Sequence, residues 1–151
     1  MNLGSLTEPQ LIFPDLPGED AGSVLRAFAQ RVVDLGYVAD ADRLYDKLME
    51  RERLGSTGIG AGVAIPHCKM KGLERAVVAI AATRRPVDFG AVDGQPVRLF
   101  FLVVSPNDTP AVHLQVLASI SRWVKANNHV ARLVEMDQRQ QIYDFLLKEE
   151  T

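Results

Sequence analysis

Two apolar runs, AVVAIAAT at residues 76–83 and VRLFFLVV at residues 97–104, occupy the middle of the chain. An uninterrupted run of β-branched and aromatic residues is typical of a strand that is covered on both faces. The segment between the runs, PVDFGAVDGQP, contains Asp93 followed by Gly94, a pair that favours a tight turn. We therefore predict two central strands, joined as a hairpin, with helices on both sides of the sheet.

Helical patterns precede these strands. Apolar residues recur at helical spacing over 24–35, and Gly36 follows where a left-handed helix cap is expected. A second helix is predicted over 40–53, with Asp40 as its N-cap and Gly55 closing it. Before both, the apolar letters LIF suggest a short strand.

Three more helices are predicted after the strands. The first covers 110–124, with Thr109 as its N-cap and a proline at the first helical position. A short helix begins after Asn127 and Asn128, and the last begins at Asp137, with a glutamine three residues on as its capping-box partner. The order of elements predicts an α/β fold, with a mixed, partly antiparallel sheet sandwiched between helices on both faces.

Composition limits the classes of function. The chain has 151 residues, 47% of them hydrophobic and 24% charged, which fits one globular domain. A net charge of -2, without a run of lysine or arginine, argues against nucleic-acid binding. The apolar runs are far shorter than the roughly 20 residues needed to cross a bilayer. Together with a single cysteine, Cys68, and an N-terminus without a signal-peptide pattern, this predicts a cytoplasmic protein that does not insert into a membrane.

The stretch GSTGIGAGVAIPHC, residues 55–68, is unusually rich in glycine. It is not a phosphate-binding P-loop, because Ala61 and Gly62 stand where lysine and a hydroxyl residue are required. It is not a dinucleotide fingerprint either, because Val63 takes the place of the third glycine. We interpret it as a loop that leads into a short strand, VAIPH, which its proline ends or confines to the sheet edge. His67 then lies at the tip of that strand.

Two histidines are candidates for chemistry. From chemistry alone, His67 is either a hydrogen-bonded structural imidazole or a neutral nucleophile able to carry a phosphoryl group. His113 shares a helix face with Leu117, Ile120 and Val124, so it is predicted to point inward from the first turn of its helix. There the helix dipole favours an anion, and a neutral imidazole can donate to it. The alternative is a half-buried histidine satisfied by the backbone.

At these residues the chain resembles a known family. RERLGSTGIGAGVAIPH, followed after the strands by HLQVLASISR, is similar to the fructose/mannitol-type IIA component of the bacterial phosphoenolpyruvate-dependent phosphotransferase system. GSTGIG looks most like the nitrogen-regulatory, PtsN-type branch. The likeness runs from about Leu6 to Leu147 and implies one EIIA type 2 domain over 1–151, with core residues 6–147. It also implies a five-stranded mixed sheet and no metal or organic cofactor.

The resemblance assigns roles to particular residues. It implies that His67 accepts a phosphoryl group from an HPr-like carrier, that His113 lies beside it, and that Arg51 supports the phosphoryl group. Taken alone, an arginine in the stretch MERERL is more typical of an ordinary solvated helix face. We further expect a phosphate-binding contribution from the loop residues Ser56, Thr57 and Gly58.

Ile59, between two glycines, is expected either to contact the carrier or to plug the core. Two residues depart from the family pattern: Ala61 replaces a common asparagine, and Cys68 replaces a common glycine. Cys68 is either a small packing residue or a redox-sensitive thiol.

Other functions are also compatible with these residues. A metal site built from His67, Cys68, His113 and His129 lacks any established ligand spacing. A regulatory binding module that is never phosphorylated is a second rival. Within the family, the phosphoryl group serves either regulatory signalling through a downstream target or sugar transport through a IIB domain. The absence of a fused permease domain in this sequence favours regulation.

Overall fold

The computed structural model describes residues 2–126 and 128–148. Within them, six strands form one mixed sheet. The strands are β1 (Ile12–Phe13), β2 (Gly58–Gly60), β3 (Val63–Ala64), β4 (His67–Met70), β5 (Val77–Val87) and β6 (Val97–Pro106). Their order is β1-β5-β6-β3-β2, and β4 also pairs with β6. Since β3 and β4 follow one another along the same side of β6, the sheet is five strands wide. This confirms the predicted mixed sheet.

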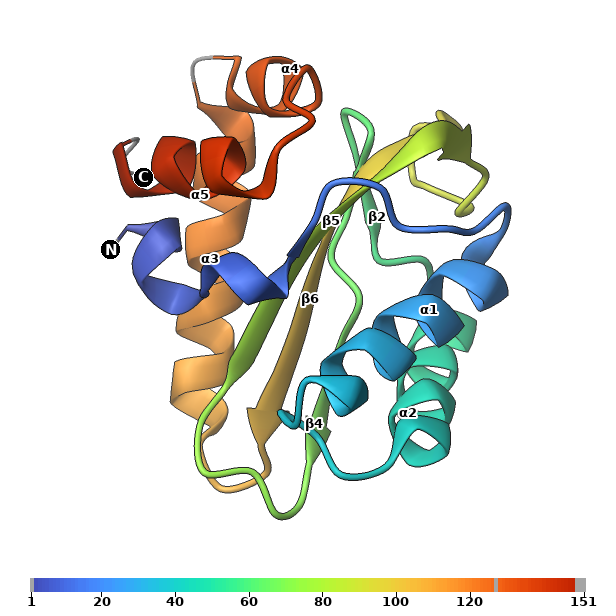
Figure 1. Ribbon diagram of the computed structural model, residues 1–151. Coiled ribbons are helices and arrows are strands. Elements are labelled where there is room, and N and C mark those ends of the chain that lie inside the picture. The colour runs from blue at the N-terminus through green and yellow to red at the C-terminus, as the bar shows by residue number, and fades with distance from the viewer. Residues whose placement is uncertain (1, 127, 149–151) are drawn as a thin grey trace.

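Helices cover both faces of the sheet (Figure 1). On one face lie α1 (Ala21–Asp34) and α2 (Ala41–Arg53). On the other lie α3 (Pro110–Lys125), α4 (His129–Leu133) and α5 (Arg139–Lys148), together with the 3-10 turns η1 (Leu3–Leu6) and η2 (Pro9–Leu11). The chain therefore forms the predicted three layers.

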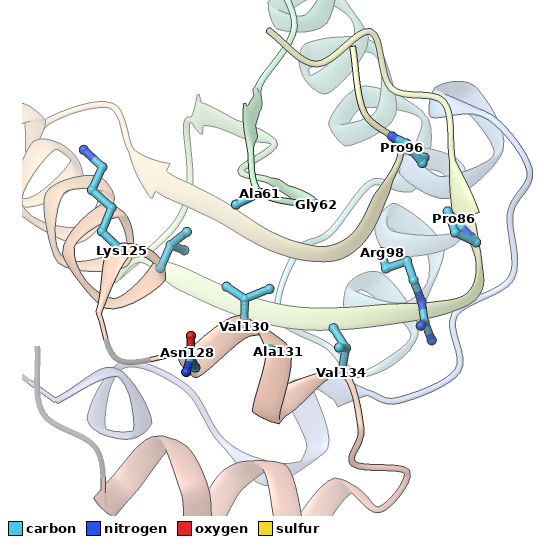
Figure 2. Close-up of a pocket in the computed structure, with 11 residues that line it drawn as sticks. Ala61, Gly62, Pro86, Pro96, Arg98, Lys125, Asn128, Val130, Ala131 and Val134 are labelled. Atoms are coloured by element: carbon cyan, nitrogen blue, oxygen red, sulfur yellow. The ribbon is translucent and has the colours of Figure 1, made fainter. Parts of the chain in front are cut away.

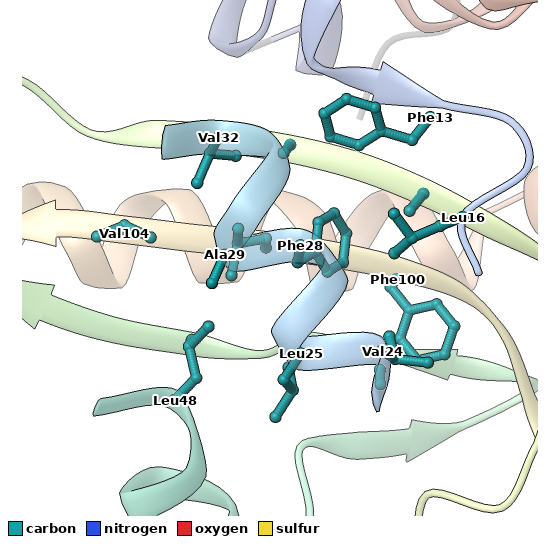
Figure 3. Packing of buried hydrophobic residues seen from close by; sticks show 14 of the residues in the cluster. Phe13, Leu16, Val24, Leu25, Phe28, Ala29, Val32, Leu48, Phe100 and Val104 are labelled. Carbon is teal, nitrogen blue, oxygen red and sulfur yellow. The ribbon is translucent and has the colours of Figure 1, made fainter. Parts of the chain in front are cut away.

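The side chains of β6 supply two separate hydrophobic cores. Phe100 belongs to a cluster with the apolar faces of α1 and α2, whereas Phe101 belongs to a cluster with α3 and α5. In the first cluster, Phe28 of α1 lies between Phe13 and Phe100, with ring centroids 6.1 and 6.5 Å away (Figure 3). Successive side chains of a strand point to opposite faces. A strand buried on both faces must therefore be apolar throughout, as these residues are.

The predicted hairpin and the predicted N-cap of α2 are present. β5 and β6 are antiparallel, and the turn between them places Gly94 at a φ of 71°, a left-handed conformation that favours glycine. The carboxylate of Asp40 accepts a hydrogen bond from the backbone N–H of Arg43 and caps α2. The short helix expected after Asn128 is α4; Asn127 lies outside the described residues.

Two helix starts differ from the prediction. α5 begins at Arg139 rather than Asp137, because the preceding residues still close α4, with the N–H of Met136 donating to the carbonyl of Leu133 at 2.9 Å. The Thr109 side chain does not cap α3, since its hydroxyl donates to the carbonyl of Pro106 instead. Neither difference changes the layers.

Candidate active site

β4 places His67 at the edge of the sheet. We predicted a strand ending at Pro66, but strand pairing resumes immediately after that residue. The carbonyl of Pro66 accepts from the N–H of Val103 at 2.9 Å, so its missing N–H costs no bond to β6. Within the described residues β4 pairs only with β6. His67 therefore starts an edge strand that can be approached from outside the sheet.

The His67 imidazole is half-buried, and its nitrogens have different environments. Nδ1 lies 2.7 Å from the carbonyl oxygen of Ile65. A carbonyl can only accept, so Nδ1 carries the hydrogen and Nε2 keeps an unprotonated lone pair. Burial lowers the pKa of His67 below its usual value, and the charge of Arg51 lowers it further, while the bond to Ile65 acts in the opposite direction. A neutral ring with a free Nε2 is suited to nucleophilic attack.

His113 lies beside His67 on the inner face of α3. The centroids of the two rings are 5.5 Å apart, and the His113 side chain is buried. Its Nδ1 lies 2.6 Å from the hydroxyl oxygen of Ser105, at the end of β6. Burial lowers the pKa of His113 to about 4, and the charges of His67 and Lys69 lower it in the same direction. The imidazole is therefore neutral at physiological pH.

A cavity of about 510 Å³ opens between α2, β4 and the start of α3. It is lined by Lys47, Glu50, Arg51, Leu54, His67, Cys68, Lys69, Asn107, His113, Leu114 and Leu117. Three of these side chains are cationic and one is a carboxylate, so the cavity suits an anion. The guanidinium of Arg51 donates to the carbonyl of Gly55 at 2.7 Å, which holds it at the end of α2. The structure thus brings His67, His113 and Arg51 together.

Sequence reasoning missed Lys47, Lys69 and Asn107 as lining residues. Lys47 is four residues before Arg51 on the same helix, a spacing that puts both on one face. Lys69 is two residues after His67 in β4, so both side chains leave the strand on the same side. These spacings were available in the sequence. Asn107, in the turn after β6, carries no comparable signal.

Ser56 and Thr57, expected to bind phosphate, do not line this cavity. The hydroxyl of Ser56 donates to the carbonyl of Phe89 at 2.6 Å. Thr57 is buried, and both its hydroxyl and its N–H donate to the carboxylate of Glu52. Burial raises the pKa of Glu52, although the two bonds from Thr57 act against that rise. Both hydroxyls hold the loop in place.

Gly58 and Ile59 also lie away from the cavity lining. A Cβ on Gly58 would come within 2.7 Å of the Ala91 side chain, so glycine is required there for packing. Ile59 is 40% exposed and does not plug the core. More exposed apolar side chains line the cavity itself, namely Leu54 at 85% and Leu114 at 67%.

The two departures from the family pattern have simple structural settings. Ala61 has a φ of 57°, a left-handed conformation that asparagine adopts more readily than alanine. Its N–H donates to the Asp93 carboxylate at 3.2 Å. Cys68 packs against the core beneath α1 and α2, and burial raises its pKa to about 12. The thiol is therefore protonated and suited to packing, since the thiolate is the reactive form.

Neither a metal centre nor a second cavity competes with this site on chemical grounds. In the described part of the chain, no three His, Cys, Asp or Glu side chains gather closely enough to hold a metal ion. A second cavity, of about 490 Å³, lies between the sheet and α4 (Figure 2). Its lining is mainly apolar, with the cations Arg98 and Lys125, and contains no histidine, cysteine or carboxylate. It therefore lacks the imidazole groups that the first cavity offers.

The family of the chain follows from comparison with known proteins. A family model described as the EIIA 2 component of the phosphoenolpyruvate-dependent sugar phosphotransferase system matches residues 5–149. The chain belongs to this family. Among its EIIA relatives is a nitrogen regulatory protein of Bradyrhizobium diazoefficiens, 35% identical over 147 residues, which cover 97% of this chain and 95% of the relative.

A second relative has a name that specifies a sugar. It is a fructose-specific EIIA component of Haloferax volcanii, 31% identical over 145 residues, covering 96% of this chain and 94% of the relative. The crystal structure of nitrogen regulatory protein IIA-Ntr from Neisseria meningitidis has the same fold, with a TM-score of 0.87 and 28% identity, covering 95% of this chain and 98% of that one. None of the helices in residues 2–126 and 128–148 is long and apolar enough to span a bilayer.

Proposed function

We propose that this EIIA domain is a phosphohistidine carrier whose His67 accepts a phosphoryl group from the phosphohistidine of an HPr-like protein. One observation carries the proposal: the Ile65 carbonyl holds the proton of His67 on Nδ1, so Nε2 presents a lone pair in a cavity rich in cations. Such a ring is already in the protonation state that attack on phosphorus requires.

The transfer exchanges one phosphorus–nitrogen bond for another. The lone pair of His67 Nε2 attacks phosphorus, the bond from phosphorus to the donor imidazole breaks, and that nitrogen regains its lone pair. The protein contributes positioning and charge stabilisation more than covalent chemistry. In this proposal His113 donates a hydrogen bond to a phosphoryl oxygen, while Arg51 and Lys69 offset the negative charge.

The carrier is proposed to dock on the rim of the cavity. We define this rim by Leu54 and Leu114, the two exposed leucines that line the cavity beside its cations. An HPr-like donor arrives with a phosphoryl group, so its charge suits Lys47 and Arg51 while its apolar surface suits the leucines. Transfer complexes are transient and bury small areas, so two leucines are a sufficient apolar centre.

We assign the phosphoryl group to regulatory signalling through a downstream target. Support comes from the nitrogen regulatory protein of Bradyrhizobium diazoefficiens and from the IIA-Ntr structure. The fructose-specific relative of Haloferax volcanii favours a second function, in which His67 passes the group to a IIB domain of a fructose/mannitol-type permease. Because the system consumes phosphoenolpyruvate, a glycolytic intermediate, both functions place the domain in the cytoplasm.

Labelling tests the proposal. The purified domain is incubated with radioactive phosphoenolpyruvate and the upstream carriers, and label that is stable to base but released by acid is counted. We expect wild type to be labelled and His67→Ala and His67→Gln to remain unlabelled. His129→Gln, a histidine variant outside the cavity, is the matched control and should be labelled like wild type. Persisting label on His67→Ala would refute the assignment.

A further inference from the structure

Ser105 is a buried polar residue near the end of β6, and the transfer proposed above assigns it no role. Its side chain is fully buried, and its hydroxyl oxygen lies 2.6 Å from Nδ1 of His113. In the register of the two strands, Ser105 of β6 lies opposite Lys69 of β4. The hydroxyl thus lies directly behind the ring that lines the cavity.

The hydrogen between Ser105 and His113 has two possible positions. If Nδ1–H donates to the serine oxygen, the serine hydrogen needs another acceptor. Within residues 2–126 and 128–148, the Ser105 side chain has no hydrogen-bond partner other than His113. A buried hydroxyl left without an acceptor is unfavourable. If instead the serine O–H donates to an unprotonated Nδ1, both groups are satisfied.

We propose that Ser105 is a positioning residue that fixes His113 in the tautomer with its hydrogen on Nε2. Nδ1 accepts the hydrogen bond from the serine hydroxyl, so Nε2 is the ring nitrogen that can donate a hydrogen bond into the cavity. His67 is held in the opposite tautomer, because its Nδ1 donates to the Ile65 carbonyl. One ring therefore presents a lone pair and its neighbour presents a donor, at a centroid separation of 5.5 Å.

The pair of tautomers gives the two rings different roles. A phosphoryl group on Nε2 of His67 has only acceptor oxygens, so a neighbouring ring helps it only by donating. Burial of the His113 ring and the nearby charge of Lys69 oppose a second proton on that ring, so the neutral tautomer must supply the donor. This catalytic consequence rests on the proposed function, whereas the tautomer itself is a property of the unmodified protein.

Nitrogen-15 NMR of the histidine rings tests the tautomer directly. In wild type at neutral pH we expect Nε2 of His113 to be protonated and Nδ1 to show the shift of an unprotonated acceptor. S105A should shift hydrogen toward Nδ1, and S105T, which keeps the hydroxyl, should restore the wild-type pattern. A protonated Nδ1 in wild type overturns the proposal, and this result needs no variant to fold. An unchanged His113 spectrum in S105A overturns it equally.

Transfer kinetics separate this inference from the proposed function. S105A should accept the phosphoryl group about tenfold more slowly, because only part of the His113 population then presents a donor. S105T should recover most of that loss. If His67→Ala is still labelled, the proposed function fails while the tautomer result stands. If His67 is labelled but the NMR shows the other tautomer, only the role of Ser105 fails.

Discussion

The imidazole rings of His67 and His113 lie with their centroids 5.5 Å apart and their planes inclined by 52°. Each ring is held from behind through Nδ1, His67 by a backbone carbonyl and His113 by a serine hydroxyl. Two rings fixed in this way cannot turn freely when a partner arrives. The site is therefore organised before any ligand reaches it, which is the condition for electrostatic stabilisation without reorganisation.

Replacing His113 should slow transfer without abolishing it. In His113→Gln, loss of the ring donor is expected to lower the rate of phosphoryl acceptance roughly 10²-fold, the usual effect of removing one preorganised donor. Rapid-quench labelling measures this rate. Gln115→Ala, on the exposed side of the same helix, is the matched control and should leave the rate unchanged. An undiminished rate in His113→Gln would remove His113 from the mechanism.

Stability should decline in mild acid because His113 is buried in its neutral form. Its pKa is about 4 in the folded chain, against about 6.5 when unfolded. Between these values the unfolded chain binds a proton that the folded chain does not, so the free energy of unfolding falls as pH decreases through this window and levels off above it. His113 contributes up to about 3 kcal/mol of this change.

Denaturant unfolding across this pH range measures the effect. His113→Gln should flatten the acid slope, leaving the smaller contribution of His67, whose pKa is lowered in the same direction. Identical slopes for wild type and His113→Gln would show that His113 does not remain neutral on folding.

Charges placed on the cavity rim should block the protein donor selectively. We expect Leu54→Asp and Leu114→Asp to lower acceptance from the HPr-like carrier while leaving acceptance from a small donor such as phosphoramidate intact, because only the carrier needs the rim. Ile59→Asp is the comparison, since Ile59 does not line the cavity. A larger loss from Ile59→Asp than from the leucine variants would move the docking surface to the glycine loop.

The sequence predicted those features that follow from periodicity and local chemistry. The two apolar runs identified β5 and β6, because a strand covered on both faces has no polar alternation. Asp40 identified the start of α2 through its cap. Helical spacing placed His113 on a buried face, and the structure puts it there.

Other features depend on contacts between distant segments. The hydroxyls of Ser56 and Thr57 find partners at Phe89 and Glu52, which periodicity does not reveal. Strand pairing resumes after Pro66 because the carbonyl of Pro66 still accepts a hydrogen bond from the N–H of Val103 in β6. Ser105 and His113 come together only when β6 and α3 pack against each other, so no local sequence pattern predicts this contact.

The atom that carries the phosphoryl group tests the central claim most directly. The protein is phosphorylated with its carriers, and phosphorus-31 and nitrogen-15 NMR then locate the new phosphorus–nitrogen bond. We predict a single phosphohistidine at Nε2 of His67, because the Ile65 carbonyl occupies the other nitrogen. A phosphoryl group on Nδ1 of His67, or on His113, would contradict the account.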